Sequence, residues 1–402
     1  MLCNFFASTK LQRSYQLTLS YRYSREYRDG FNRRNVGCTK AYPLHLPDPA
    51  CVEFIIPNLP AGLRRCVYIF FRAGFSQIFA LYDIARLFMF FKKIRPAIVH
   101  INNGGYPGAI SCRAAAISAK LSGVDNIIMV VNNRAVPYTS LWRWLDFPMD
   151  WAVKKSVKQF VTGSNAAAEQ LRFVLGLCER RARSFNNGIS PRASMEEYSE
   201  TRLRFGLDSY SGLVFGIVAV MEARKGHLIL LKAIEILQTE GVINIDNFRL
   251  LIEGDGLLRG ELEAYVRKNN LKNYVFFVGN ENNIFDFMKV LDCVVAPSIA
   301  DEDFPNVVLE SMYLGKIVVA SKLAGIPEQI IDGVSGLLVD PGDPHDLARA
   351  LALTISNPER MKILAAAAQE RFNAEFTADI AVDRYLKLYD GLLRDMECSV
   401  AS

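Results

Sequence analysis

The chain lacks the short motifs that mark a metal site or a disulfide framework. Its eight Cys are scattered through 402 residues without a C-x-x-C pair, and its four His are widely separated. Scattered cysteines of this kind are typical of free thiols in a reducing compartment. We therefore expect a cytoplasmic protein without a zinc site or stabilising disulfides.

The chain also lacks a long uncharged apolar run. Its most hydrophobic stretch, residues 67–93, is interrupted by Arg72, Asp83 and Arg86, so we expect no membrane span. Two interpretations of this predicted helix stay open. It packs on a sheet as part of the core, or it lies in a membrane interface with its basic flanks in water. The first eight residues lack the order of a signal peptide and instead resemble the end of an amphipathic helix.

The small net charge of +5 hides an asymmetry between the two halves of the chain. Residues 1–190 carry 26 Lys and Arg against 10 Asp and Glu, a net +16, while the remainder carries 21 against 32, a net −11. A basic half indicates an anionic partner. No nucleic-acid-binding motif accompanies the charge, so we expect no nucleic acid partner. The predicted partner is the anionic inner face of the cytoplasmic membrane, on which the protein would be peripheral.

Apolar runs of strand length alternate with helical patterns along most of the chain, which is typical of parallel, doubly wound α/β domains. Strands are predicted at 16–21, 52–56, 97–101, 127–131, 159–162, 213–220, 249–253, 276–279, 293–296 and 317–320, and helices at about 108–122, 140–156 and 165–176. Residues 22–50 are turn-rich and are predicted to form a loop. The length favours two domains, residues 1–190 and 191–374, with a last helix in 375–402 crossing back onto the first.

One stretch, residues 291–341, carries the clearest functional signal. A buried strand at 293–296 is followed by a loop and by a helix that opens at 304–306. Unpaired N–H groups and the helix dipole make such a junction a binding site for phosphate. Glu302 and Glu310, eight positions apart, are suited to accept hydrogen bonds from sugar hydroxyls. The stretch therefore predicts a nucleotide-sugar site.

Glu302-Asp-Phe-Pro305 together with Glu310 resembles the E-x7-E signature of family-4 retaining glycosyltransferases. The downstream Gly315, the motif at 324–328 and Gly336 resemble that family in order and spacing. The resemblance is clear over residues 213–343 and looser before them. It implies the GT-B architecture, in which two Rossmann-like domains face each other across a cleft.

The resemblance also implies a reaction. A sugar would move from a nucleoside-diphosphate-sugar donor to a glycan or lipid-linked acceptor with retention of configuration, in cell-surface polysaccharide or lipopolysaccharide biosynthesis. No metal or other cofactor is expected, because basic side chains and a helix N-terminus neutralise the leaving group in this fold.

The donor-binding residues that the resemblance implies are Lys225, Gly254, Gly256, Phe304, Pro305 and Glu310. Arg224, from the next turn, is the candidate substitute for the family's Arg, whose position falls on Val220. Lys225, with Arg224, would hold the diphosphate, and Glu310 would accept hydrogen bonds from the ribose hydroxyls. The glycines would allow close approach to the nucleotide, and the backbone at 304–305 would lie near the phosphates. Glu302 would contact the donor sugar as a catalytic residue.

A Gly-rich turn follows the strand at 97–101 and should face the ligand crevice. Its polar and glycine positions, the predicted acceptor side of the site, are Asn102, Asn103, Gly104 and Gly105. His100 is a second candidate catalytic residue. Its other interpretation, a histidine satisfied within the core, stays open.

Three further expectations follow from departures of this sequence from known patterns. A nicotinamide-dependent oxidoreductase is disfavoured, because Gly260 comes one residue late for G-x-G-x-x-G. The family's Arg falls on Val220, which keeps a non-catalytic, sugar-nucleotide-binding remnant as the alternative function. The resemblance also places a strand and a Gly-rich loop before residue 1, so the first strand of the N-terminal domain is predicted to be missing.

Overall fold

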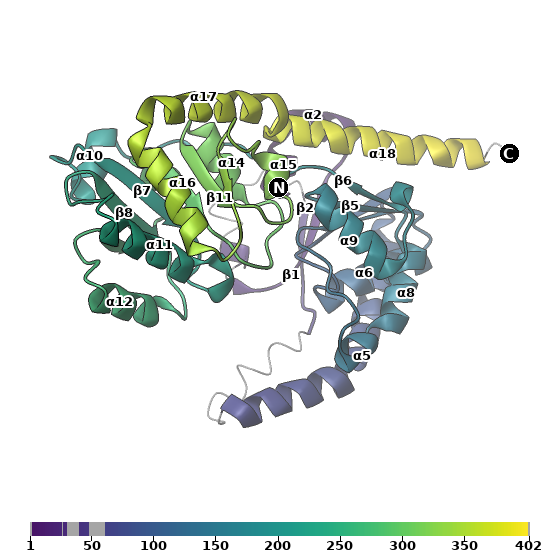
Figure 1. Cartoon of the computed structure of the whole chain (residues 1–402). Coiled ribbons are helices and arrows are strands. Elements are labelled where there is room, and N and C mark those ends of the chain that lie inside the picture. The colour runs from purple at the N-terminus through teal and green to yellow at the C-terminus, as the bar shows by residue number, and fades with distance from the viewer. Residues whose placement is uncertain (1, 26, 30–39, 48–60, 401–402) are drawn as a thin grey trace. The chain divides into compact units, whose positions relative to one another are not determined.

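The computed structural model describes residues 2–25, 27–29, 40–47 and 61–400, which form two compact units (Figure 1). Unit 1 comprises Met1–Asn186 and Ala381–Ser402, and unit 2 comprises Asn187–Ile380. Both boundaries lie a few residues from the predicted ones. None of the described helices is both long and apolar enough to cross a bilayer.

Unit 1 contains two parallel sheets. The larger has the order β3 (Ile98–Asn103), β4 (Asn126–Val131), β5 (Gln159–Thr162), β6 (Ala182–Ser184), and the smaller pairs β1 (Thr18–Arg22) with β2 (Lys40–Leu44). The predicted loop at 22–50 was therefore wrong at β2. This strand is half exposed and contains Pro43, which is tolerated at a sheet edge but hides the strand pattern. The strand predicted at 52–56 lies outside the described residues.

Among the described residues of unit 1, the named helices include α1 (Leu2–Ala7), α2 (Thr9–Ser14), α5 (Ala61–Ile94), α6 (Ile110–Leu121), α7 (Leu141–Trp144), α8 (Phe147–Ser156), α9 (Asn165–Leu175) and most of α18 (Ala378–Val400). The single helix predicted at 140–156 is in fact two, α7 and α8. Asp146 separates them, its carboxylate bound by Arg113 at 2.8 Å, and Pro148 lies in the first turn of α8. Proline is favoured there because its missing N–H would be unpaired anyway.

The last helix returns to unit 1, as predicted. Tyr385 and Tyr389 of α18 are buried against Phe5, Ile128 and Val130, so the helix completes one side of the β3–β6 sheet. Two large aromatic side chains buried in one cluster provide strong packing at this position.

Unit 2 is built on one parallel sheet of order β12-β11-β10-β7-β8-β9. Its strands are β7 (Leu213–Val218), β8 (Phe248–Glu253), β9 (Val275–Gly279), β10 (Cys293–Ala296), β11 (Ile317–Ser321) and β12 (Leu337–Val339). Its helices are α10 (Tyr198–Arg204), α11 (His227–Thr239), α12 (Arg259–Lys268), α13 (Ile284–Lys289), α14 (Asn306–Tyr313), α15 (Ile326–Gln329), α16 (Pro344–Ser356) and α17 (Pro358–Glu375). Because β7 lies between β8 and β10, the chain reverses its direction across the sheet there.

Helices cover both faces of this sheet. Phe215 and Val295 face the cluster that contains α11 and α16, while Val214 and Val294 face the opposite cluster. Coverage on both faces explains why β10 and β11 are buried at every position, and why both could be predicted from apolar runs alone.

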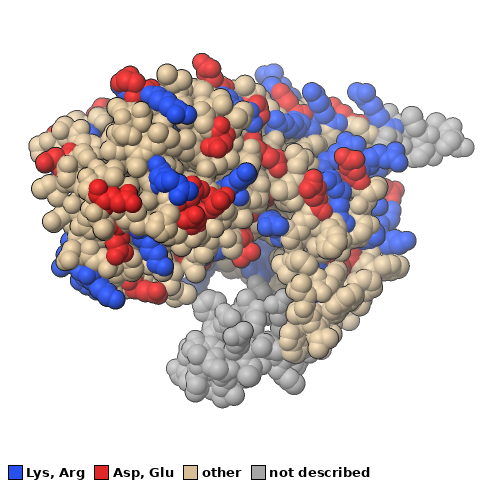
Figure 2. All heavy atoms as spheres, viewed as in Figure 1, with Lys and Arg blue, Asp and Glu red and all other residues tan. Residues whose placement is uncertain are grey.

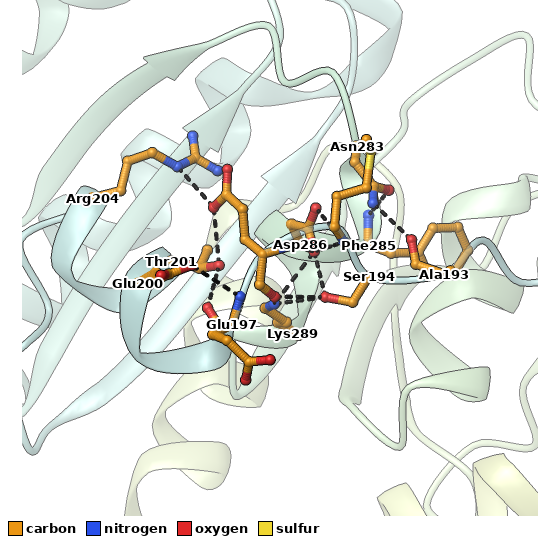
Figure 3. A network of polar contacts seen from close by, with 12 residues as sticks. Ala193, Ser194, Glu197, Glu200, Thr201, Arg204, Asn283, Phe285, Asp286 and Lys289 are labelled. Atoms are coloured by element: carbon orange, nitrogen blue, oxygen red, sulfur yellow. Dashed lines mark hydrogen bonds and ion pairs between the residues drawn. The ribbon is translucent and has the colours of Figure 1, made fainter. Parts of the chain in front are cut away.

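A polar network anchors the segment that precedes α10 onto α13 (Figure 3). The carboxylate of Asp286 accepts hydrogen bonds from Ser194 Oγ at 2.5 Å and from Met195 N at 3.1 Å. Lys289 Nζ lies 3.3 Å from the same carboxylate, which is buried. The network fixes residues 193–197 at one end of unit 2.

Candidate functional site

Two loops meet at the point where the sheet of unit 2 reverses. The loop after β7 (219–226) and the loop after β10 (297–305) are joined by a hydrogen bond from Ile299 N to Arg224 O of 2.8 Å. Gly226 has a φ of +73°, and a Cβ there would lie 1.8 Å from Pro297 O, so a side chain cannot fit. In open α/β sheets, ligands bind at such a switch point beyond the carboxyl ends of the strands.

An ion pair joins two of the predicted site residues across these loops. Lys225 Nζ contacts Glu302 Oε2, and the two side chains are 17% and 13% exposed. Ser298 Oγ also donates to Glu302 Oε2, at 3.2 Å. The structure thus brings together a cation and a carboxylate that lie 77 positions apart in the sequence. Ser298 was not predicted as a site residue, although its place in the loop after β10, two residues beyond the strand, was a signal for it.

Arg224, the second predicted diphosphate ligand, is held by other groups. Its Nε donates to Glu222 Oε2 at 2.8 Å, and its Nη1 donates to Asp301 O at 3.3 Å. About a third of the Arg224 side chain is exposed, so the guanidinium lies at the rim of the two loops.

Gly254 and Gly256 follow β8, the next strand of the sheet. A Cβ on Gly254, whose φ is +117°, would lie 2.2 Å from Ala219 O, and one on Gly256 would lie 2.7 Å from Met221 O. Both glycines are therefore needed for contact with the neighbouring loop. Their predicted approach to a nucleotide stays a prediction.

Helix α14 and the two residues before it contain the remaining donor-side residues. Phe304 is buried against Phe376, and Pro305 caps the helix. Glu310, one turn in, is half-buried, and its carboxylate accepts no hydrogen bond from any residue that the structure describes. Burial raises the pKa of Glu310, and the nearby Arg192 partly opposes this rise. A carboxylate in this state is a ready acceptor for hydroxyl groups.

The predicted acceptor-side residues lie in unit 1, where the two asparagines hold the Gly-rich turn. Asn103 is 1% exposed; its Oδ1 accepts from Ala109 N, and its Nδ2 donates to Pro107 O, both at 3.2 Å. Asn102 Oδ1 accepts from Asn132 Nδ2 at 2.7 Å. The asparagines thus shape the turn from within. Gly104 and Gly105 lie on its open side, with no close atom around a Cβ at Gly104.

His100 lies within β3 among aromatic residues of the core. Its Nδ1 is hydrogen-bonded to the hydroxyl of Tyr389, and its ring centroid lies 5.4 Å from that of Phe5 and 5.3 Å from that of Tyr385. Burial lowers the pKa of His100 to about 4, so the ring is neutral at pH 7. These surroundings favour the core interpretation of His100.

No three His, Cys, Asp or Glu side chains gather into a possible metal site within the described ranges. At the switch point of unit 2 the structure places the Lys225 ammonium, the Arg224 guanidinium, the carboxylates of Glu302 and Glu310, and the N-terminus of α14.

The segment that carries these loops corresponds to a known family. Residues 203–371 match the model of glycosyl transferases group 1. The matched segment begins in α10 and ends in α17, so it spans most of unit 2 and contains every predicted donor-side residue.

Curated relatives match over part of their length. An uncharacterised glycosyltransferase of Methanocaldococcus jannaschii is 32% identical over 198 residues, which are 48% of this chain and 50% of the relative. The lipopolysaccharide core biosynthesis glycosyltransferase LpsD of Rhizobium meliloti is 29% identical over 167 residues, 42% of this chain and 46% of the relative. The chain thus spans about half the length of these relatives.

Solved structures extend the likeness to the whole chain. The structure of Anabaena HepE in complex with UDP superposes with a TM-score of 0.73 at 17% identity, covering 97% of this chain and 95% of the other. The fold is therefore GT-B, with Rossmann-like sheets in both units, as the sequence predicted.

Proposed function

We propose that the protein is a retaining glycosyltransferase that uses a nucleoside-diphosphate sugar as donor. The observation that carries this proposal is the Lys225–Glu302 ion pair at the switch point. The carboxylate of Glu310, which accepts no hydrogen bond from the described residues, lies in α14, the helix that follows the loop of Glu302. A cation for a diphosphate and two acceptors for hydroxyls are the groups that such a donor requires.

Each of these residues has a role in the proposed reaction. Lys225 leaves Glu302 and pairs with the diphosphate, whose charge grows as its bond to the anomeric carbon breaks. The N-terminus of α14 adds to this stabilisation. Glu302, freed from the lysine, accepts a hydrogen bond from a hydroxyl of the donor sugar, and Glu310 accepts hydrogen bonds from the ribose hydroxyls. The acceptor oxygen bonds to the anomeric carbon on the face that the diphosphate leaves, and its proton departs to the phosphate or to solvent.

The class of substrate is supported by the similar proteins. One relative belongs to lipopolysaccharide core biosynthesis, and one structural neighbour holds UDP. UDP-sugars are therefore the first donors to test, followed by GDP-sugars. The proposed acceptor is a glycan or a lipid-linked glycan, reached by a protein that is cytoplasmic and peripheral on the membrane.

Calorimetric titration of the full chain with UDP- and GDP-sugars tests the site. Lys225→Met and Glu310→Gln each weaken a charge-assisted contact to the donor, so each should lower donor affinity by roughly ten- to a hundredfold. Lys362→Met is the matched control, because Lys362 is 71% exposed and pairs with the exposed Glu359. Equal affinity in the wild type and both site variants would contradict the assignment.

One observation favours a second candidate function. Val220, which lies just after β7 and is 51% exposed, stands where the resemblance expects an Arg for the diphosphate. A non-catalytic protein that binds the donor without transferring its sugar is therefore the alternative. It predicts donor binding in calorimetry together with no release of nucleoside diphosphate.

A further inference from the structure

The stretch Leu141–Trp151, in α7 and the first half of α8, has its charges inside and its tryptophan rings outside. The side chains of Arg143 and Asp150 are 5% and 1% exposed. Trp142, Trp144 and Trp151, from the same eleven-residue stretch Leu141–Trp151, are 52%, 52% and 57% exposed. This inverts the usual arrangement, in which charged groups lie in water and large apolar rings are mostly covered.

A buried ionic network holds the two helices in this orientation. Arg143 Nη1 lies 2.6 Å from Asp150 Oδ2, and Arg113 Nη1 lies 2.8 Å from Asp146 Oδ1. Tyr138 donates to Asp150 at 2.6 Å and stacks under Arg143, whose Cζ lies 4.2 Å from the ring centroid. Buried ion pairs gain little net stability, because desolvation offsets their attraction. A gain in stability from the buried network therefore does not explain why the tryptophans are exposed.

The exposed apolar residues of this stretch, which we term the tryptophan patch, are Leu141, Trp142, Trp144, Leu145, Phe147 and Trp151. Within the patch, the ring centroids of Trp144 and Phe147 lie 5.8 Å apart. It holds all three tryptophans of the chain. Gln77 Nε2 of α5 donates to Leu145 O at 3.2 Å, so the exposed Ile78 and Leu81 of α5 lie beside the patch. Figure 2 shows where charged side chains lie on one face of the molecule. Contiguous exposed apolar surface of this kind marks an interaction site.

The exposed charges that residues 134–158 contribute near the tryptophan patch are basic. Between residues 134 and 158 the acidic side chains are Asp146 and Asp150, and both are paired with arginines. Lys155 is exposed at its margin, where its Nζ lies 5.6 Å from the ring centroid of Trp151. The patch therefore suits a partner whose apolar interior is covered by a layer of anionic groups.

We propose that the tryptophan patch docks on a lipid bilayer that carries anionic headgroups. Tryptophan prefers the boundary between headgroups and acyl chains, and neighbouring lysines reach the lipid phosphates. A second copy of the chain fits less well, because a two-fold contact would set the same basic margins against each other. The net charge of +16 in residues 1–190 supports the same choice. This inference goes beyond the proposed transfer reaction and does not depend on it.

Intrinsic fluorescence tests the proposal directly, since every tryptophan of the chain lies in the patch. Full-length protein is mixed with vesicles of phosphatidylcholine and phosphatidylglycerol, or of phosphatidylcholine alone. We expect a blue shift of the emission and quenching by brominated acyl chains with the anionic vesicles. Added salt should reverse both changes. Unchanged emission with anionic vesicles, or the same shift with neutral ones, would overturn the proposal.

Sedimentation of matched variants with the same vesicles completes the test. Trp142→Ser/Trp151→Ser removes two half-exposed rings and should lower partitioning by at least about tenfold, with the thermal melt unchanged. Phe173→Ser is the control, because Phe173 of α9 is 83% exposed outside the patch. An equal loss in both variants would overturn the proposal. So would a blue shift that appears without vesicles as protein concentration rises, because a second copy would then cover the patch.

Discussion

Removal of the Asp286 carboxylate should loosen unit 2 at the network shown in Figure 3. The carboxylate is 3% exposed and accepts bonds from the Ser194 hydroxyl and from the backbone of Met195. The variant Asp286→Ala also leaves the Lys289 ammonium, 16% exposed, without its ion-pair partner. Loss of one member of a buried charged pair costs about 3–5 kcal/mol. That is a large part of the stability of a domain, which is about 5–15 kcal/mol.

The predicted loss is large enough to measure by calorimetry. For a unit of this size, each kcal/mol shifts the Tm by about 2–4 °C, so the transition of unit 2 should fall by roughly 6–20 °C. Hydrogen exchange should rise most at residues 193–204, which the network anchors. Glu359→Ala is the control, since its ion pair with Lys362 is more than 70% exposed on both sides and should contribute about 0–1 kcal/mol. Equal melting of the two variants would refute the reasoning.

The same carboxylate makes a prediction about pH. Burial alone would raise the pKa of Asp286, but hydrogen bonds from Ser194 and the backbone of Met195 outweigh it and hold the pKa below its usual range. The unfolded chain then binds a proton more readily than the folded one. This contribution to stability is present above about pH 4 and is lost as the pH falls through the folded pKa. In Asp286→Asn that part of the acid sensitivity should disappear.

Three other predictions concern single positions. Gly226→Ala should push the loop away from Pro297 O and lower donor affinity at least about tenfold in calorimetry, with an unchanged circular dichroism spectrum; unchanged affinity would count against the site. Tyr389→Phe removes the hydrogen bond to His100 and should cost about 1–3 kcal/mol of stability without altering donor affinity. A loss of donor affinity in this variant would contradict the core interpretation of His100. Burial raises the pKa of Asp83 to about 6, so stability should fall as the pH rises from 4 to 6, and Asp83→Asn should melt higher than wild type at pH 7 but not at pH 4.

Much of the fold could be predicted because doubly covered parallel strands leave a strong signal. The strands at 159–162 and 293–296 were predicted with the bounds that the structure shows. β2 was missed because an edge strand with a proline and alternating exposure looks like a loop. The break between α7 and α8 was missed because it depends on Arg113, a residue of another helix.

The candidate site could be predicted only in part. Spacing and resemblance identified Lys225 and Glu302, but their direct contact depends on how two distant loops close over Gly226. A sequence cannot show whether a glycine is needed by a ligand or by its own chain, and Gly254 packs against Ala219. Asn103 turned inward for a similar reason, since its amide satisfies the backbone of its own turn.

The most direct test of the central claim is an assay, read out by chromatography, for the release of nucleoside diphosphate from a panel of UDP- and GDP-sugars. We predict that the full chain releases the diphosphate from at least one donor, faster with an added glycan acceptor. Lys225→Met should lose this activity while keeping the circular dichroism spectrum of the wild type. Binding of no donor, or release that Lys225→Met leaves unchanged, would contradict the account.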